Sequence, residues 1–322
     1  MDKEHLRFLG LDSKDAAIMY ELDLDCRQSN AEIGRKVRLD KSVVGYRIDK
    51  LMEKGLIREF YTVVDYGATG YVGYRTYLKW QFVDKAKEAE IINYLKSRKS
   101  VWWVSEITGY WNLGFVFWAK DFTEFEEFWF EFLKRYQGFI SKKVLAIYHR
   151  LYDCNYSFLC PEKAPHYSIL GKKGRETLSE SDTSILDAIS ASARKSTVKI
   201  AEETGLSVAT VKQRIKSMQK RGIIKAFRAK IDEKRLGYSL YKINFFLSDL
   251  SNHSKMLEFC LSRPDVAYVP VSIGFADFEA EIMARSNSEV EDFINEFLGK
   301  YAASVRSYDY FVFTKAHKVR YW

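Results

Sequence analysis

The feature that most constrains this chain of 322 residues is an internal repeat. The segment Ser29–Phe60 returns as Ser196–Phe227 at a constant offset of 167 residues and without a gap. The nine positions that are identical in the two copies are Ser29/Ser196, Ile33/Ile200, Leu39/Leu206, Val44/Val211, Arg47/Arg214, Ile48/Ile215, Gly55/Gly222, Ile57/Ile224 and Phe60/Phe227. Self-similarity over such a length defines the architecture before any local pattern does. We therefore expect two copies of one design.

Each copy of the repeat has the pattern of two short helices joined by a turn and followed by a wing strand. Ser29 is a suitable N-cap, and Glu32 completes a capping box. Asp40 and its counterpart Ser207 can each cap the second helix, which Gly55 would end. Apolar residues at helical spacing predict the buried stripe of that helix, namely Val43, Val44, Ile48 and Leu51, matched by Thr210, Val211, Ile215 and Met218.

The opposite face of each second helix is polar and basic. A helix pair with such a face fits the major groove of DNA. We therefore expect DNA contacts from Lys41, Ser42, Gly45, Tyr46, Arg47 and Lys50, and from Ala209, Lys212, Gln213, Arg214 and Lys216. Arg47 and Arg214 suit phosphate contacts or bracing of the helix, whereas Gln213 suits adenine and Lys212 suits guanine. Two copies with the same caps and the same basic face favour DNA binding over an ordinary helical pair.

The charge differs between the two copies. The whole chain has a formal net charge of +8, which favours a polyanionic partner. Residues 179–232 hold eleven Lys or Arg against six Asp or Glu, a net of +5, whereas residues 12–65 hold ten against eleven, a net of −1. We therefore expect the second unit to supply more of the phosphate affinity. The charge of the first unit leaves open an alternative, a sensor that recruits a protein partner and has lost DNA contacts in one half.

After each helical unit the period of the sequence changes, and a β-α-β-β-α-β order follows. The strands and helices expected in the first copy are Tyr71–Phe82, Asp84–Ser97, Val101–Thr108, Leu113–Ala119, Phe122–Tyr136 and Lys143–Tyr152. Those expected in the second copy are Tyr238–Leu247, His253–Leu261, Val266–Ser272, Phe278–Ala284, Ser288–Tyr301 and Val305–Thr314. This order is that of a ferredoxin-like sandwich. The free face of each sheet must be covered, and the other half of the chain can cover it.

The predicted fold is therefore of the α+β class, with two repeats of a winged helix-turn-helix and a ferredoxin-like sandwich. The expected divisions are residues 1–66, 67–153, 154–178 as a linker, 179–233 and 234–322. The linker lacks clear periodicity and holds two of the four prolines. The tail from Lys315 is basic and aromatic, and we expect it to be docked or frayed rather than bound to DNA.

Several classes of site are not expected. The four cysteines are not paired by spacing, which favours a reduced, intracellular and cytoplasmic setting. The first residues lack the apolar core of a signal peptide, and no apolar run reaches about 18 residues, so no membrane association is expected. No catalytic triad, metal motif or cofactor motif is found. Five tryptophans could suggest a ligand box but fit sheet and helix cores better; they are Trp102, Trp103, Trp111, Trp118 and Trp129.

The segments LDSKDAAIM and SNAEIGRKVRLDKSVVGYRIDKLMEKGLIREF, followed by the sandwich with its turn Gly274–Asp277, resemble the leucine-responsive/asparagine-regulator (Lrp/AsnC) family of transcription regulators. The resemblance covers nearly the whole chain twice. It implies DNA binding through the winged units, pairing of the sandwiches sheet to sheet, further assembly through the sandwich domains, and a small effector such as an amino acid. Family members are usually single-copy, so this chain resembles a covalent dimer.

The resemblance also implies an effector site at the turns that contain Gly109 and Asn112 in the first copy and Gly274 and Asp277 in the second. Asn112 replaces the aspartate of the second copy, which puts the first site in doubt. The same domain pairing resembles sirohaem decarboxylases, for which His149-Arg150 is the pair to test. The sequence favours a regulator over an enzyme, and the expectation is that the chain is not an enzyme.

Overall fold

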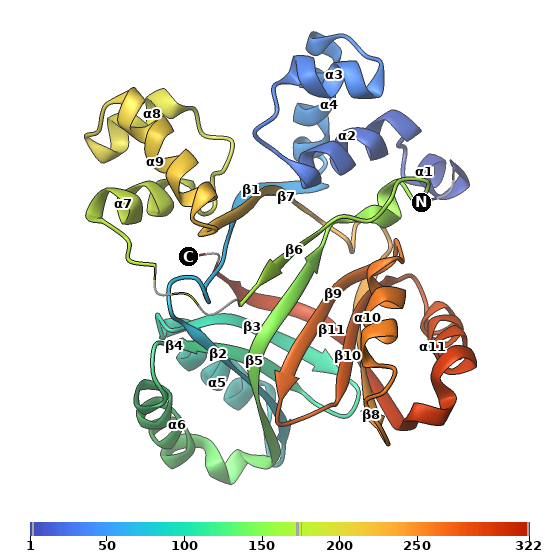
Figure 1. Cartoon of the computed structure of the whole chain (residues 1–322). Helices are drawn as coiled ribbons and strands as arrows, with labels where there is room; N and C mark the ends of the chain where they lie inside the picture. The colour runs from blue at the N-terminus through green and yellow to red at the C-terminus, as the bar shows by residue number, and fades with distance from the viewer. Residues whose placement is uncertain (2, 172–173, 175, 321) are drawn as a thin grey trace.

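The computed structural model describes the chain apart from residues 2, 172–173, 175 and 321. Two helical units lie side by side above two sandwiches (Figure 1). The first unit comprises α1 (Lys3–Phe8), α2 (Ser13–Leu24), α3 (Asn30–Val37), α4 (Lys41–Glu53) and β1 (Ile57–Val64). The second comprises α7 (Glu180–Ile189), α8 (Thr197–Thr204), α9 (Val208–Lys220) and β7 (Ile224–Ile231). Helix α1 was not expected from the sequence.

The helix caps follow the sequence closely. The capping box of Ser29 with Glu32 is confirmed. The side chains of Asp40 and Ser207 accept backbone N–H bonds at the start of α4 and α9. Gly55 follows α4 in the left-handed region, with a φ of +68°. The two second helices therefore begin and end where local sequence signals place them.

The buried stripes of the second helices are narrower than expected. The expected burial of Val43 is wrong, because its side chain is 38% exposed. Its counterpart Thr210 is only partly covered. The buried residues are Val44, Ile48 and Leu51 on α4, and Val211, Ile215 and Met218 on α9. One apolar residue per turn faces the core, which leaves most of each helix surface outside it.

The wing strands pair with each other rather than with a second strand of their own unit. Strands β1 and β7 form an antiparallel two-stranded sheet that joins the two units. The junction is symmetric across the repeat: the N–H of Cys26 donates to the carbonyl of Phe227 at 2.8 Å, and the N–H of Ala193 donates to that of Phe60 at 2.8 Å. One apolar core extends through both units. The two helical units are therefore mounted on one platform, which we call the β1–β7 sheet.

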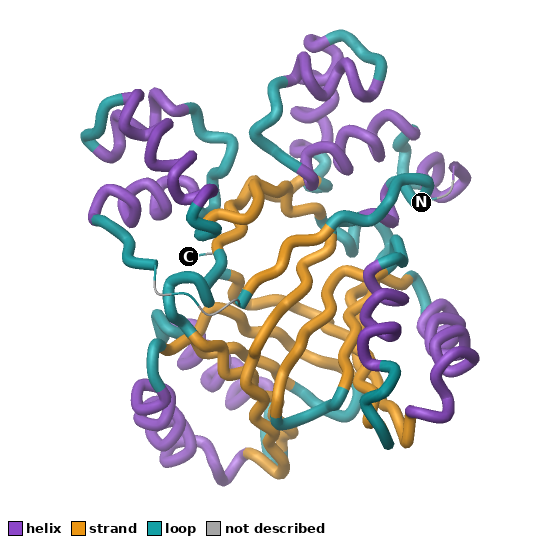
Figure 2. The backbone as a smooth tube through the Cα atoms, in the orientation of Figure 1, coloured by secondary structure: helices purple, strands orange, loops and turns teal. Residues whose placement is uncertain are grey.

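The expected β-α-β-β-α-β order is confirmed in both sandwiches. The first contains β2 (Val72–Trp80), α5 (Lys85–Ser97), β3 (Val101–Thr108), β4 (Leu113–Ala119), α6 (Phe122–Tyr136) and β5 (Ile140–Cys154). The second contains β8 (Ser239–Leu247), α10 (His253–Leu261), β9 (Val266–Ile273), β10 (Phe278–Ala284), α11 (Asn287–Tyr301) and β11 (Val305–Val319). In each sandwich an apolar core lies between the helices and one sheet face. The other faces are turned toward each other (Figure 2).

Two long strands link the sandwiches into one sheet. Strand β5 pairs with β2 of its own half over its first part and with β9 of the other half from Ile147 onward. Strand β11 likewise pairs with β8 and then, from Val312, with β3. The order β2-β4-β3-β11-β8-β10-β9-β5 closes because β5 also pairs with β2. The tail that was expected to be docked or frayed continues as strand β11 to Val319.

The segment between the halves is packed against both of them. Strand β6 (Tyr167–Leu170) pairs with the end of β5. Tyr156, Phe158 and Leu159 are buried in the core of the helical units. The expected linker is therefore a structural part of the molecule, and its residues 172–173 and 175 lie outside the described part of the chain.

Candidate nucleic-acid interface

The residues expected to contact DNA lie on α4 and α9, and Figure 1 shows these helices on the side of the β1–β7 sheet away from the sandwiches. The side chains or positions that are well exposed are Lys41, Ser42, Tyr46 and Lys50 on α4, and Ala209, Lys212, Gln213 and Lys216 on α9. Gly45, Arg47 and Arg214 are partly covered. The buried faces of both helices are apolar, which leaves the polar faces free for a partner.

On α4, two of the three basic side chains, Arg47 and Lys50, form ion pairs within the protein. Arg47 Nη1 lies 2.9 Å from a carboxylate oxygen of Asp12 and 2.8 Å from one of Asp15, so it braces α4 against the start of α2. Lys50 pairs with Glu53 at 2.7 Å, and that hydrogen bond raises the pKa of Lys50. These contacts reduce the positive charge that α4 presents to a phosphate.

On α9, the basic side chains are less engaged. Lys212 and Lys216 form no ion pair within the described part of the chain, and Arg214 lies 3.9 Å from Asp182. The position of Lys50 is held by Ser217 in the second copy, and Lys216 occupies the preceding position. Helix α9 therefore presents its lysines to solvent, in keeping with the net charge of +5 of its unit.

The base of the platform combines symmetric and asymmetric ion pairs. Arg58 pairs with Asp232, and its counterpart Lys225 lies 3.5 Å from Asp65. The buried Arg228 has no such mate in the first copy, where Tyr61 holds the same position. Burial and the neighbouring carboxylates of α2 and β5 act on Arg228 in opposite directions, and the carboxylates prevail and raise its pKa. Arg228 therefore ties β7 to the first helical unit and to the first sandwich.

Arg228 makes these ties through two buried aspartates. Its Nε and Nη2 lie 2.8 and 2.9 Å from the two carboxylate oxygens of Asp23 on α2, and its Nη1 donates to Asp153 on β5. Asp23 also accepts a hydrogen bond from the N–H of Tyr156 at 2.6 Å. The group links three segments that are far apart in the sequence, so it fixes where the helical units stand relative to the sandwiches.

The turns expected to hold an effector have a defined structural geometry. Asn112 Oδ1 accepts from the N–H of Trp80 at 2.9 Å, and Asp277 Oδ2 accepts from the N–H of Leu247 at 2.8 Å. These two N–H groups are equivalent in the repeat, so asparagine and aspartate perform the same task at the ends of β2 and β8. Effector binding at these turns stays a prediction.

The glycines of the same turns are needed for close packing. Gly109 and Gly274 have φ values of +135° and +112°. A Cβ atom on Gly274 would lie 2.7 Å from the carbonyl oxygen of Leu145 in the other half, and one on Gly109 would lie 3.0 Å from Cβ of Phe311. Each turn therefore packs against the long strand of the opposite half, where it helps to join the two sandwiches.

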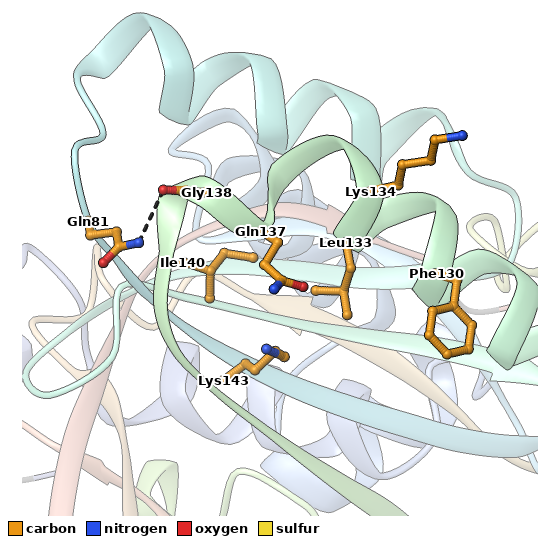
Figure 3. Close-up of a pocket in the computed structure, with 8 residues that line it drawn as sticks. All are labelled: Gln81, Phe130, Leu133, Lys134, Gln137, Gly138, Ile140 and Lys143. Atoms are coloured by element: carbon orange, nitrogen blue, oxygen red, sulfur yellow. Dashed lines mark hydrogen bonds between the residues drawn. The ribbon is translucent and has the colours of Figure 1, made fainter.

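A separate hollow lies on the outside of the first sandwich, where α6 meets the start of β5 (Figure 3). Gln81 Nε2 donates to the carbonyl of Gly138 at 3.1 Å across its rim. Phe130 at its edge is 62% exposed, and Lys134 and Lys143 extend beside it. The hollow is far in the fold from α4 and α9, so it offers lysines that can serve as controls for the DNA-facing ones.

Comparison with known proteins agrees with this geometry. A family model described as winged helix-turn-helix DNA-binding matches residues 11–58 and again residues 178–225. The transcriptional regulator LrpA of Pyrococcus horikoshii is 31% identical over 129 residues, which are 38% of this chain and 87% of LrpA. LrpB of Bacillus subtilis is 27% identical over 117 residues, 36% of this chain and 78% of LrpB.

The chain belongs to the Lrp/AsnC family. It carries a tandem duplication of the family's winged helix-turn-helix, as the two matches of the family model show. Its relatives are transcription regulators, and they support a DNA-binding transcription regulator here. The Lrp/AsnC resemblance inferred from the repeated segment is thereby confirmed.

One expectation about function is wrong as it was stated. Over 95% of this chain and 93% of the other, the fold matches the siroheme decarboxylase NirDL, with a TM-score of 0.65 and 14% sequence identity. At this identity the similarity establishes the fold alone, but the protein that shares this fold is an enzyme. The flat expectation that the chain is not an enzyme is therefore corrected, because its duplicated architecture is compatible with catalysis.

The residues expected to matter for such an enzyme lie away from the interior. His149 is exposed on β5, Arg150 is half-buried beside it, and neither lines the cavity between the two sandwiches. Among the residues that are described, no group of three or more His, Cys, Asp or Glu side chains is placed to hold a metal ion. None of the described helices is both long enough and apolar enough to cross a membrane.

Proposed function

We propose that this Lrp/AsnC protein is a sequence-specific transcription regulator that binds double-stranded DNA in the cytoplasm as a covalent pseudo-dimer. The main support for the proposal is that the units containing α4 and α9 are joined by the single β1–β7 sheet, and that the polar faces of both helices are exposed. In a dimer of helix-turn-helix units, two recognition helices contact major grooves about one DNA turn, ~34 Å, apart. The two units would then occupy two half-sites of one operator.

Within this proposal the two half-sites have different roles. Gln213 and Lys212 on α9 and Ser42 and Tyr46 on α4 are the exposed side chains in a position to reach base edges. Because these residues differ between copies, the operator should be an imperfect palindrome. The second unit would supply most of the phosphate affinity, since Lys212 and Lys216 on α9 form no ion pair within the described part of the protein.

We also propose that a small effector modulates DNA binding, and that sandwich domains assemble chains into larger oligomers. Both follow from family membership together with the joined sandwiches, which hold the two helical units through Arg228. A ligand that shifts the sandwiches against the β1–β7 sheet would change the spacing of α4 and α9.

The test is binding of the full chain to double-stranded DNA by fluorescence anisotropy, with selection from a random library and repeated at several salt concentrations. We expect a selected site with two unequal half-sites, and an affinity that falls steeply as salt rises. Protection of only one major groove would contradict the two-site arrangement. Absence of binding at low salt would reject the regulator.

A second experiment distinguishes the proposed DNA-binding function from binding of a tetrapyrrole. The full chain would be mixed with iron uroporphyrin and its absorption spectrum recorded. No bound Soret band, together with specific DNA binding, is the expected outcome. A stoichiometric Soret band in a chain that does not bind DNA would overturn the proposed function.

A further inference from the structure

An internal cavity of about 310 Å³ lies beneath the β1–β7 sheet, between the two sandwiches. Its roof is formed by Tyr61–Val64 and Tyr66. Its walls come from both sandwiches, and they include Trp102, Trp103 and Trp118 of the first and Tyr268 and Glu281 of the second. A volume of this size is at the lower end of sites for small molecules, which occupy ~300–1,000 Å³.

The cavity lies on the pseudo-twofold axis that relates the halves. From β3 and β9 onward, equivalent residues of the two halves are 165 positions apart, as the turn glycines Gly109 and Gly274 show. With that offset, lining residues occur as repeat-related pairs, namely Trp103/Tyr268, Val116/Glu281, Tyr148/Phe313 and Leu151/Ala316. In a dimer of identical chains, a cavity on the axis would have two identical walls. Here the two walls are free to differ.

The walls do differ in chemistry. In the first half, Trp102 and Trp118 line the cavity, whereas their repeat counterparts are Ala267 and Met283. The ring centroids of Trp118 and Tyr66 are 3.6 Å apart. In the second half, acidic Glu281 replaces Val116. The wall from the first half therefore carries the three tryptophans, and the wall from the second half carries Glu281 and most of the lysines.

The unpaired charges around the cavity are mostly positive, and three of the basic residues, Lys234, Lys315 and Arg320, are exposed to solvent at its edge. Asp153 is paired with Arg228, and Glu281 with Lys242, whose Nζ lies 2.9 Å from Glu281 Oε1. Of the other charged lining residues, one is acidic and four are basic; they are Glu233, Lys230, Lys234, Lys315 and Arg320. Lys230 and Lys315 form no ion pair in the part of the chain that the structure describes. An anion would therefore be favoured over a cation.

Two buried hydroxyl groups belong to residues that line the same cavity. The hydroxyl groups of Tyr66 and Tyr77 have no hydrogen-bond partner among the described residues, and their residues are 5% and 1% exposed. A buried polar group without a partner destabilises the folded state, because its lost hydrogen bonds to water are not replaced. A ligand or an ordered water that reached them would recover part of this cost.

We propose that this cavity binds one small planar aromatic carboxylate per chain, with its ring against Trp102, Trp103 or Trp118 and its carboxylate toward Lys230 and Lys315. The ring would pack on the wall contributed by the first half. The carboxylate would lie toward the basic side chains of β7 and β11. The duplication makes such a polarised site possible, because each wall is encoded separately.

If the proposed function holds, this ligand acts on DNA binding through the β1–β7 sheet. The residues that form the roof of the cavity include four of β1, which pairs with β7 and holds both helical units. Filling the space between the roof and the sandwiches would stiffen the β1–β7 sheet. This coupling rests on the proposed function, whereas occupancy of the cavity does not.

The test uses 2-naphthoate as the probe and isothermal titration calorimetry on the full chain. We expect one binding site with a Kd of about 1 mM or tighter. The cation 2-naphthylmethylamine tests the charge, and cyclohexanecarboxylate tests the need for a planar ring; both are expected to bind at least about tenfold more weakly. A naphthylmethylamine that bound as well as naphthoate would overturn the proposal.

The site is located with paired variants. Lys230→Ala with Lys315→Ala should weaken naphthoate binding about tenfold or more, since two charge-assisted contacts are lost. Lys134→Ala with Lys143→Ala, at the outer hollow of Figure 3, should leave binding unchanged. Circular dichroism would check that each variant is folded, and the glutamine pair would replace the alanine pair if it is not.

Two outcomes would overturn the inference. They are no detectable binding of naphthoate at millimolar concentration, and binding that the Lys230 and Lys315 variants leave unchanged. Anisotropy with DNA on the same preparations keeps the proposals separate. A chain that binds DNA but not naphthoate retains the proposed function and loses the cavity ligand, and the opposite result retains the ligand and loses the regulator.

Discussion

The two helical units have the same scaffold but use their charges differently. Both begin their helices with the same kind of cap and place the same apolar stripe against the core. In the first unit, Arg47 and Lys50 are held by acidic residues of the same unit. In the second unit, Lys212 and Lys216 are exposed and unpaired within the described chain. The caps and apolar stripes that folding requires are therefore shared by the two units. The exposed charges that a binding partner would contact have diverged.

At the junction beneath the units the asymmetry is reversed, because here the ion-paired basic residue belongs to the second half. There the first half contributes Tyr61, and the second half contributes the buried Arg228 with its two aspartate partners. An ion-paired group at one copy and an aromatic one at the other cannot arise in a dimer of identical chains. The fusion therefore allowed the halves to specialise while their backbone hydrogen bonds stayed symmetric.

The largest expected effect concerns this junction. Arg228→Met would leave Asp23 and Asp153 buried without their cation, and breaking a buried pair in this way costs about 3–5 kcal/mol in the free energy of unfolding. The matched control, Arg58→Met on β1, removes a half-exposed partner of Asp232 and should cost about 1 kcal/mol or less. Urea unfolding followed by circular dichroism measures both. Equal losses of unfolding free energy in the two variants would show that the buried Arg228 contributes no more stability than the exposed Arg58.

The acid stability of the joined sandwiches depends on an acidic residue present in only one half. Glu279 lies between Arg75 and Lys242, and its repeat counterpart is Gly114. Burial by itself would raise the pKa of Glu279, but Arg75 and Lys242 lower it from 4.5 to about 2. Because the folded-state pKa is depressed, this stabilisation is present above pH 4.5 and is lost as pH falls toward 2.

The measurement is the free energy of unfolding between about pH 5 and pH 3 for the native chain and for Glu279→Gln. The variant should be less stable near neutral pH and should lose less stability on acidification, since it has no carboxylate to protonate. The change Glu126→Gln, at an exposed position of α6, serves as the control. Parallel pH curves for the native chain and Glu279→Gln would contradict the assignment.

Lysine substitutions test whether α9 contributes more than α4 to the binding of DNA phosphates. Lys212→Ala with Lys216→Ala should weaken DNA binding about tenfold and reduce the salt slope by about 2, because each phosphate contact contributes about 0.9. Lys41→Ala with Lys50→Ala should reduce the slope by about 1 or less, since Lys50 is already paired with Glu53. Anisotropy titrations at several salt concentrations give both slopes. Equal reductions of the salt slope by the two pairs of substitutions would show that the two units contribute equally to phosphate binding.

The smallest effect is expected at the turns. Exchanging Asn112→Asp and Asp277→Asn should each change the free energy of unfolding by less than about 0.5 kcal/mol, because both residue types accept the equivalent backbone N–H. Alanine at either position should cost about 1 kcal/mol through the lost hydrogen bond. Urea unfolding distinguishes these cases. A large cost for only one exchange would indicate that the two turns have different tasks.

Local structure could be predicted from the sequence because its determinants are local. Caps such as Ser29 and Asp40 lie next to the helices they start, and the bounds of β3, β4 and α6 follow from their own side-chain periodicity. Most of the exposed face of α4 and α9 was predictable for the same reason, although Val43 was wrongly assigned to the buried stripe of α4. These features depend on residues a few positions apart, whatever the remainder of the chain does.

That one half covers the sheet of the other was expected from the sequence, but the pairing of β5 with β9 and of β11 with β3, and the contacts between the facing surfaces, could not be predicted. Glu279 and Glu281 alternate with Ala280 and Ile282, a pattern that is typical of a strand with one face in solvent. The second half instead turns that face toward the first, where Arg75 and Lys242 neutralise the acids. The cavity was missed for a related reason: three tryptophans with ordinary core spacing line a space that exists only after the halves have joined.

The closed order of strands has a consequence for synthesis of the chain. Strand β3 is made early, but one of its edges pairs only with the end of β11, about two hundred residues later. Until the ribosome has released that last strand, the first half carries an open, apolar strand edge that can join another nascent copy. Protection of this edge during translation would decide how much of the protein reaches the single-chain form.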